Sequence, residues 1–561
     1  MSDAPERAAG GAAGTVERIA DTDDTMVDDA AALDSVSGNG LLRSNLVVAA
    51  GTALSRLTGL ARLIVFALVI GRTALGDAYL LANETPNIVY DLLLGGLLSA
   101  TLVPLFSTFL VERDDESTNV VIGTAAALMT GLTAIAVLAA PLIFGIYSVN
   151  VEDADPAVFR EVGTTLARLF LIQILFYGLT GLANAFLNSR RRFFAAAWSP
   201  ILPNLIIIAT LLSLPDPGPD GWQLDDVLTD DRLRFTLGLG ATLGIGSMLL
   251  VLIPACLRTG FRFRPRVRWR HPAVRKLLTL SFWTIGFVFA NQVAVAVVRN
   301  LAGPGSSDAT AYVLAFTFFV LPHGLLAVSI ATTFQPEMAR AVARRSKPDF
   351  LSSASLGVRM TALITIPAGF GMFVLREPLI GLAFQRGEFD AADVLATSRA
   401  LAGFALGLGA FSVYLFVLRG FYAHKDTRTP FTVNVIENAI NVILALVLVD
   451  RYGVLGLGAA FALAYAVSSV WTLQILNYKV PGFPLREVFA SLWRVVLASV
   501  LMAEAVWLVA RQVGGNAGLD AAVRIGVGTA IGILVYAGVL LALRAPELEV
   551  VRRRLQVGSS P

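Results

Sequence analysis

Long apolar runs constrain this chain more than any other feature of its sequence. Residues 237–257, 430–449 and 521–543 each contain at most two ionisable side chains. A helix needs about 20 apolar residues to cross a bilayer, and counting such runs along the chain yields fourteen candidates. Only 15% of the residues are charged, whereas soluble domains carry about a quarter. The sequence therefore predicts an all-α polytopic membrane protein with about 14 transmembrane helices, which leaves little room for a catalytic domain.

Basic residues collect in alternate loops. Residues 258–276 carry eight Arg or Lys and no acid, whereas residues 215–231, in a loop of opposite parity, hold six Asp. Smaller basic clusters share the first parity: residues 190–192, 340–347, 425–428 and 552–554. Because cytoplasmic loops collect Lys and Arg, both termini are predicted to be cytoplasmic. The alternative, nucleic-acid binding by residues 258–276, fits less well with their position between apolar spans.

The chain resembles itself at a lag of about 234 residues. Residues 188–194 (NSRRRFF) precede a span with Pro203-Asn204, and residues 422–428 (YAHKDTR) precede a span with Glu437-Asn438. Both copies fall at spans of the same parity, which predicts parallel repeats with a substrate site between them near the membrane midplane. The predicted organisation has five parts: a disordered acidic tail (1–40), an N-lobe of six helices (41–257), a C-lobe of six helices (258–480), two further helices (481–545) and a basic cytoplasmic tail (546–561).

Two arginines lie inside the first predicted span. Arg56 and Arg62 are six residues apart, so on a helix they lie about 120° apart, on one broad side. Charges in the hydrocarbon are costly and usually face a cavity or a partner, and arginine stays charged and binds phosphate through two parallel hydrogen bonds. We interpret the pair as a cationic patch that receives an anionic substrate. The alternative is that Arg56 pairs with Asp77 or Glu84 to tie two helices together.

The second predicted span is unusually polar. It starts at Asp77 and contains Glu84, Pro86 and Asn87. Proline removes a backbone hydrogen bond, and a break of this kind is tolerated in a membrane only where protein or water covers it. The span is therefore predicted to be bent or broken beside a cavity.

The eleventh predicted span holds a second candidate site. Glu437 and Asn441 lie one helical turn apart, which suits a coupling cation such as Na⁺ or H⁺, with interhelical hydrogen bonding as the alternative. No other cofactor, no metal site and no catalytic residue is predicted. The sequence contains neither a G-x-x-x-x-G-K-[ST] phosphate loop nor an H-E-x-x-H motif, so the chain is not expected to be an enzyme.

Several stretches resemble one family of membrane proteins. They are residues 55–62 (SRLTGLAR) with Gly76-Asp77-Ala78, residues 322–340 (PHGLLAVSIATTFQPEMAR), residues 385–389 (QRGEF) and residues 420–430 (GFYAHKDTRTP). In this order they are similar to the MurJ/MviN lipid II flippases, within the multidrug/oligosaccharidyl-lipid/polysaccharide exporter superfamily. The Ala-, Arg- and Val-rich composition suggests a high-GC bacterium, such as an actinobacterium.

The resemblance implies a function and a set of site residues. The chain would flip lipid II, an undecaprenyl-pyrophosphate-linked disaccharide-pentapeptide, across the bacterial cytoplasmic membrane for peptidoglycan synthesis and cell shape. The positions implied for substrate binding are Arg56, Arg62, Asp77 and Asn87, and those that shape the cavity and its gate are Gly59, Glu84, Pro86 and Pro322. The last two helices would form a groove for the lipid tail. Thr317 stands where the family carries an arginine, so the cavity would be less cationic.

Two other functions stay open. One is another exporter of the same superfamily, for a polysaccharide-lipid intermediate or for drugs. The other is a non-transporting membrane scaffold that recruits cell-wall synthesis proteins. Besides lipid II and membrane lipids, such proteins are the expected partners, and nucleic acid is not.

Overall fold

The computed structural model describes residues 48, 50–87, 102–190, 192–218 and 221–545. Within these residues all regular secondary structure is helical, as predicted. Ten of the described helices are long and apolar enough to cross a bilayer, or eleven if α18 and α19, which meet at 47°, form one span. The count of fourteen therefore stays a prediction. The two terminal tails and residues 88–101, which follow Asn87 in the second predicted span, lie outside the described residues.

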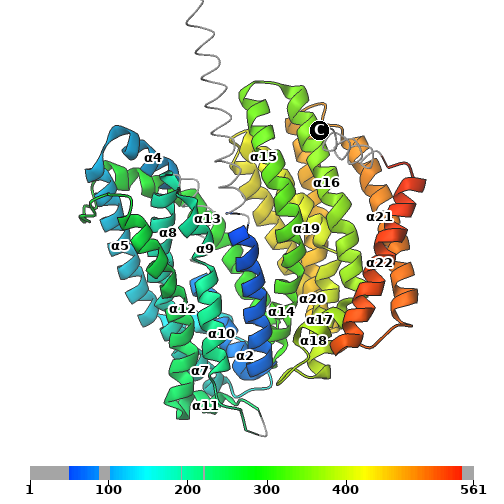
Figure 1. The fold of residues 1–561 in the computed structure, drawn as a ribbon, viewed down its shortest axis with the longest axis horizontal. Helices are drawn as coiled ribbons and strands as arrows, with labels where there is room; N and C mark the ends of the chain where they lie inside the picture. Colours follow the sequence, from blue (N-terminus) through cyan, green and yellow to red (C-terminus); the bar gives the residue numbers. More distant parts are fainter. Residues whose placement is uncertain (1–47, 49, 88–101, 191, 219–220, 546–561) are drawn as a thin grey trace, which may run out of the picture.

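The helices form two groups that lie side by side, with two more helices at one flank (Figure 1). The first group consists of the first helix (Ala50–Ile70), α2 (Ala74–Ala82), α4 (Val103–Glu112), α5 (Asp115–Leu138), α6 (Ala140–Tyr147), α7 (Pro156–Leu171), α8 (Gln173–Ser189), α9 (Phe193–Trp198), α10 (Ile201–Leu212), α11 (Leu224–Thr229) and α12 (Asp231–Leu257). We call this group the N-lobe.

The second group, the C-lobe, follows along the chain. It consists of α13 (Pro272–Leu301), α14 (Asp308–Pro322), the π-helical turn η2 (His323–Ala327), α15 (Val328–Ala343), α16 (Lys347–Val374), α17 (Arg376–Phe384), α18 (Ala391–Ala405), α19 (Leu408–Ala423) and α20 (Arg428–Lys479). The last two helices, α21 (Leu485–Ala510) and α22 (Gly518–Ala542), pack on α16 and α17 at the outer flank of the C-lobe (Figure 1). Whether they hold a lipid tail stays a prediction.

Two helices break where the sequence contains proline or glycine. Helix α2 ends at Ala82 and the chain turns at Asn83 before a helix resumes at Glu84. Pro86 has no N–H to donate to the carbonyl of Ala82, which accounts for this end and agrees with the predicted break. The 52 residues of α20 are interrupted at Gly453, where φ is 54° and ψ −137°, so two helices meet there at a kink.

The internal repeat is visible in one pair of equivalent contacts. In the N-lobe, Asn204 on α10 donates to the hydroxyl of Thr58 at 3.0 Å on the first helix. At the matching place in the C-lobe, Asn438 on α20 donates to the side chain of Asn291 at 2.8 Å on α13. The lag of about 234 residues aligns Asn204 with Asn438. Each of them therefore bonds to the first helix of its own half.

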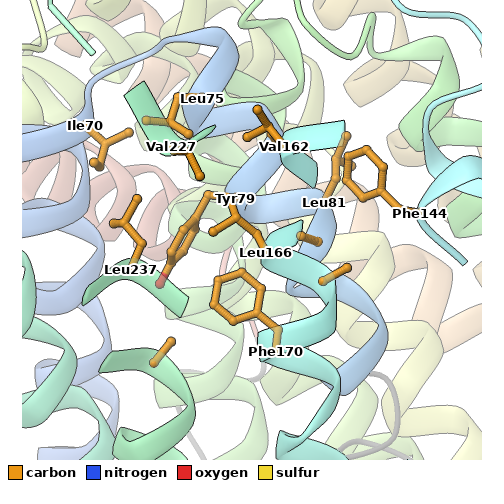
Figure 2. Packing of buried hydrophobic residues seen from close by; sticks show 14 of the residues in the cluster. Ile70, Leu75, Tyr79, Leu81, Phe144, Val162, Leu166, Phe170, Val227 and Leu237 are labelled. Carbon is orange, nitrogen blue, oxygen red and sulfur yellow. The ribbon is translucent and has the colours of Figure 1, made fainter. Parts of the chain in front are cut away.

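The short helix α2 is anchored in the core of the N-lobe. Figure 2 shows Leu75, Tyr79 and Leu81 of α2 among Leu166 and Phe170 of α7. The Tyr79 and Phe170 rings meet edge to face at a centroid distance of 5.0 Å. Packing of this kind fixes the orientation of α2, because aromatic pairs in a close-packed interior leave few alternative rotamers. It thereby sets the position of Asp77, on the same helix.

Candidate substrate-binding site and interlobe junction

Asp77 connects the two lobes. Its side chain is fully buried, and all the hydrogen bonds it accepts come from the start of α14 and the loop before it. Oδ1 accepts from the backbone N–H and the hydroxyl of Thr310 at 2.7 and 2.6 Å, and Oδ2 accepts from the backbone N–H groups of Gly305 and Ser307, both at 2.9 Å. The carboxylate thus satisfies donors at a helix N-terminus that would otherwise lack partners.

The residue before Asp77 explains why the two elements can approach so closely. A Cβ at Gly76 would lie 3.1 Å from the hydroxyl of Thr310 and 3.2 Å from the carbonyl of Gly71, which is tighter than most real contacts. Thr73 begins α2 by accepting the N–H of Gly76 at 3.0 Å. The Gly76-Asp77-Ala78 motif therefore builds a contact between the lobes.

Arg72 adds ion pairs to the same region. Its Nη1 lies 3.0 Å from Asp308 at the start of α14, and its Nε lies 2.8 Å from Asp393 on α18. The Arg72 and Asp393 side chains are 20% and 13% exposed, so both are largely shielded from solvent. Arg72 is not among the residues predicted from the sequence, although its place directly after the first span could have singled it out.

The QRGEF stretch completes the contact. Glu388 donates its backbone N–H to the carbonyl of Leu68 at 3.1 Å. Gly387 has a φ of +60°, and a Cβ there would overlap the same carbonyl oxygen, so the position requires glycine for two reasons. We call these contacts, from Leu68, Arg72 and Asp77 to the loops before α14 and α18, the interlobe junction; it lies in the lower half of Figure 1.

Two further predicted site residues lie beyond the break in the second span. Glu84 forms an ion pair with the buried Arg299 of α13, with Nη2 3.2 Å from Oε2. Asn87 accepts from the hydroxyl of Tyr177 on α8 at 3.2 Å. Pro86, between them, is buried. Neither Asp77 nor Glu84 pairs with Arg56, so the helix-tying pair considered from the sequence is absent here, and Arg299 is the cation that ties Glu84.

Arg56 reaches from the first helix to the C-lobe. Its guanidinium occupies the space that a Cβ at Gly324 would fill, in the π-helical turn that follows Pro322. Turns of this kind are frequent at functional sites. Next to it, His323 shares a 2.9 Å hydrogen bond with the buried Ser412 of α19. Pro322 and Gly324 together therefore shape a place where an arginine of the other lobe can lie.

The two arginines of the first helix are alike in their exposure and in their lack of partners among the described residues. Arg56 and Arg62 are both partly exposed, and neither makes a hydrogen bond or ion pair with any other described residue. Arg62 lies within electrostatic range of Tyr79. Gly59, between them, packs 3.7 Å (measured from an added Cβ) from Asn204, an ordinary contact that does not demand glycine. The pair leaves its guanidinium donors available to an anion.

Arg419 on α19 is a further residue that was not predicted from the sequence. Its Nη1 donates to Gln335 of α15 at 2.8 Å, and it lies within electrostatic range of His323, as Arg56 does. It therefore adds positive charge on the C-lobe side, where Thr317 only bonds its own helix, donating to the carbonyl of Val313 at 2.9 Å.

The candidate cation site lies inside the C-lobe. Glu437 is 2% exposed and hydrogen-bonds the hydroxyl of Tyr465, on the second half of α20. The side-chain oxygens of Asn434 and Asn441, one turn to either side, are buried without a partner among the described residues. A carboxylate and amide oxygens are donors that a hard cation accepts, so the residue types fit the predicted ion.

The GFYAHKDTRTP stretch has a local structural role. Asp426 accepts from the backbone and hydroxyl of Thr429 at 3.1 and 2.7 Å and from Lys479 at 2.7 Å. Partial burial raises the pKa of Asp426, but the hydrogen bonds from Lys479 and Thr429 outweigh it and lower the pKa to about 2. The motif thus joins the two ends of the kinked α20.

Two helical lobes, a buried polar junction between them and two arginines on the first helix that pair with no described residue define a multi-pass membrane transporter. Comparison with known proteins narrows this class. The family model described as "Lipid II flippase MurJ" matches residues 66–527. Since the match covers most of the 561 residues of this chain, the chain belongs to the lipid II flippase MurJ family.

Individual relatives agree with this assignment. The probable lipid II flippase MurJ of Rhizobium meliloti is 27% identical over 93% of this chain and 97% of its own length. The probable lipid II flippase MurJ of Haemophilus influenzae is 28% identical over 84% of this chain and 94% of its own length. A solved lipid II flippase MurJ in an inward closed conformation shares the fold, with a TM-score of 0.73 over 89% of this chain and 99% of that one at 22% identity. An inward-facing multidrug resistance MATE transporter also shares the fold. The match has a TM-score of 0.61 over 76% of this chain and 95% of the transporter, at 13% identity.

Proposed function

We propose that this chain flips lipid II across the cytoplasmic membrane by alternating access. Its membership of the flippase family supports the substrate. One structural observation carries the proposal: the first helix carries two arginines that pair with none of the described residues, while its far end, at Leu68, is bonded to the C-lobe. Arginine suits a pyrophosphate, because its planar fork binds two phosphate oxygens at once.

The basic loops set the orientation that we propose. Residues 258–276 and the turn between α15 and α16 lie at the end of the molecule opposite the interlobe junction (Figure 1). If these loops are cytoplasmic, both termini are cytoplasmic too, and the junction closes the outer side. This conformation would then accept lipid II from inside, with Arg56 and Arg62 on its pyrophosphate and the tail beside α21 and α22.

The remaining assignments follow from this cycle. Asp77 acts at the gate between the lobes and not on the substrate, because all its bonds go to the C-lobe in the closed junction. Glu84, Pro86, Asn87 and Pro322 shape the second and eighth spans around the cavity. Glu437 and Asn441 bind the coupling cation, which Na⁺- and pH-dependence of transport by their alanine variants would test.

A depletion experiment tests the substrate and the site together. The protein is depleted in its host, and lipid II on the cytoplasmic side is measured after rescue by wild type, Arg56→Ala, Arg62→Ala or the control Arg344→Ala, which changes an exposed residue in a basic turn. We expect wild type and the control to relieve the accumulation, and the two site variants to fail. Unchanged sidedness of lipid II on depletion would instead favour another exporter.

A scaffold predicts a different pattern. It would keep full function in the Arg56→Ala and Arg62→Ala variants and lose it when cytoplasmic loops are deleted. Arg56 and Arg62, which pair with no described residue, favour transport, because a scaffold has no use for such charges in a membrane span.

A further inference from the structure

The connection between α12 and α13 has an alternating pattern that flippase activity does not explain. Residues 261–270 read FRFRPRVRWR, with arginine at every even position and an apolar residue or proline at every odd one. Residues 261–268 form no helix, and every second N–H from Arg264 to Arg268 bonds to α5, as in an extended chain whose successive side chains point to opposite sides; residues 269–270 form a turn. We call residues 261–270 the strap.

The strap is fixed along the first turns of α5. The side chain of Asn119 accepts the N–H of Arg264 at 2.6 Å, and its carbonyl accepts the N–H of Arg266 at 3.3 Å. Further along, Thr124 accepts the N–H of Arg268 at 3.0 Å. A Cβ at Gly123 would lie only 2.6 Å from the backbone of Arg266, so glycine there admits the strap. The segment is therefore a built element with one register.

The position along α5 gives the strap a depth in the membrane. Helix α5 is a candidate span from Asp115, and at 1.5 Å per residue Thr124 lies about 13 Å from that end. Its apolar run begins at Val120. The guanidinium of Arg268 turns back to Glu116 in the first turn, at 2.7 Å. An arginine whose backbone lies deep and whose charge reaches outward is typical of the membrane interface.

From Arg264 to Arg270 every residue of the strap is exposed, the apolar residues as well as the arginines. Phe263 at its beginning packs on Phe186 of α8, but Val267 and Trp269 are 52% and 54% exposed. Arg262, Arg264 and Arg270 are also exposed and form no ion pair with another described residue. Tryptophan prefers the headgroup level of a bilayer, and clustered arginines beside a span attract anionic lipid.

We propose that the strap binds acidic phospholipid headgroups of the cytoplasmic leaflet. Val267 and Trp269 lie at the boundary of the acyl chains, and Arg262, Arg264 and Arg270 bind the headgroup phosphates. The proposal rests on the membrane orientation given above, but not on the identity of the transported lipid.

Native mass spectrometry of the purified full chain tests it, with phosphatidylglycerol and phosphatidylcholine titrated separately. The strap variant is Arg262→Gln/Arg264→Gln/Arg270→Gln. The control is Arg340→Gln/Arg344→Gln/Arg345→Gln, which removes equal charge from exposed positions at the end of α15 and in the turn after it. Each arginine near an anionic surface contributes a factor of about five. We expect the strap variant to lower the apparent affinity for phosphatidylglycerol at least about ten-fold, and the control to change it less than about two-fold.

Trp269→Ala is the second variant, because it leaves every charge in place. We expect it to weaken phosphatidylglycerol binding about three-fold or more, by loss of the buried aromatic area. Equal losses in the strap and control triples, equal affinity of wild type for the two lipids, or an unaffected Trp269→Ala would each overturn the proposal. All strap variants keep Arg56 and Arg62, so lipid II sidedness in cells reports on the proposed function separately.

Discussion

The first helix meets the C-lobe in opposite ways along its length. At its end, Leu68 accepts a hydrogen bond from Glu388, and the following Arg72 and Asp77 are bonded to α14 and α18. Two to four turns earlier, Arg62 and Arg56 make no hydrogen bond or ion pair with a described residue. One end of the interface therefore has its polar groups satisfied by protein, and the other keeps donors for an anion. The bonds of the junction therefore stabilise this conformation, and the two arginines are the groups that are available to the substrate.

The contrast is one of burial as well as of partners. Asp77 is fully buried and accepts four hydrogen bonds, so removing it would leave buried donors without acceptors. Arg56 is partly exposed and has no hydrogen bond or ion pair with a described residue to break when it binds another group. Changes at the junction should therefore shift the balance between conformations, whereas changes at Arg56 should act on the substrate.

The largest effect is expected from Asp77→Ala. It leaves the N–H groups of Gly305, Ser307 and Thr310 unsatisfied, at a cost of about 3 kcal/mol to the closed junction. The readout is the reaction of Leu68→Cys, in a Cys256→Ala chain, with a membrane-impermeant thiol reagent. We expect labelling about 100-fold faster, and an unchanged rate would show that the junction does not depend on this carboxylate.

A steric change at the same junction should have a smaller effect. Gly387→Ala places a Cβ against the carbonyl of Leu68 at a φ of +60°, and we expect a cost of about 2 kcal/mol. The same cysteine should then react about 30-fold faster. Gly371→Ala, where an added Cβ meets nothing within 4 Å, is the matched control and should leave the rate unchanged.

Arg72→Gln should have the third-largest effect on labelling at the junction. It removes two ion pairs, but Asp308 is 40% exposed and solvent screens the interaction, so about 1 kcal/mol is expected. Labelling should rise about five-fold and the rise should shrink in high salt. An effect as large as that of Asp77→Ala would contradict the ranking by burial.

Asp426→Asn is expected to have the smallest effect, and Asp426 lies at the end of the molecule opposite the interlobe junction. Junction labelling should stay the same, while thermal stability should fall by about 1 kcal/mol near neutral pH. The pKa of Asp426 is about 2 in the folded protein against an ordinary 3.8. Its contribution is therefore present above pH 3.8 and is lost as the pH falls toward 2. Equal stability of wild type and variant at pH 6 would contradict this.

Much of the architecture could be predicted because single spans and breaks have local causes. Apolar length predicts helices, and Pro86 predicts the end of α2 near Ala82. The partners of Asp77 could not be predicted, because Thr310 lies 233 residues away and nothing near Asp77 distinguishes a cavity residue from a residue of the junction. The sequence also could not show that Gly324 makes room for Arg56, since the π-helical turn depends on packing around α14 and α19.

The central claim is that the junction must open for transport. A short, reducible bifunctional thiol reagent joining Leu68→Cys to Glu388→Cys, in the Cys256→Ala chain, tests it directly in vesicles that report lipid II translocation. These residues share a backbone hydrogen bond of 3.1 Å in the closed junction. We expect that cross-linking stops translocation, that reduction restores it, and that the reagent leaves translocation by either single-cysteine variant unchanged. Translocation at the full rate by the cross-linked protein would contradict it.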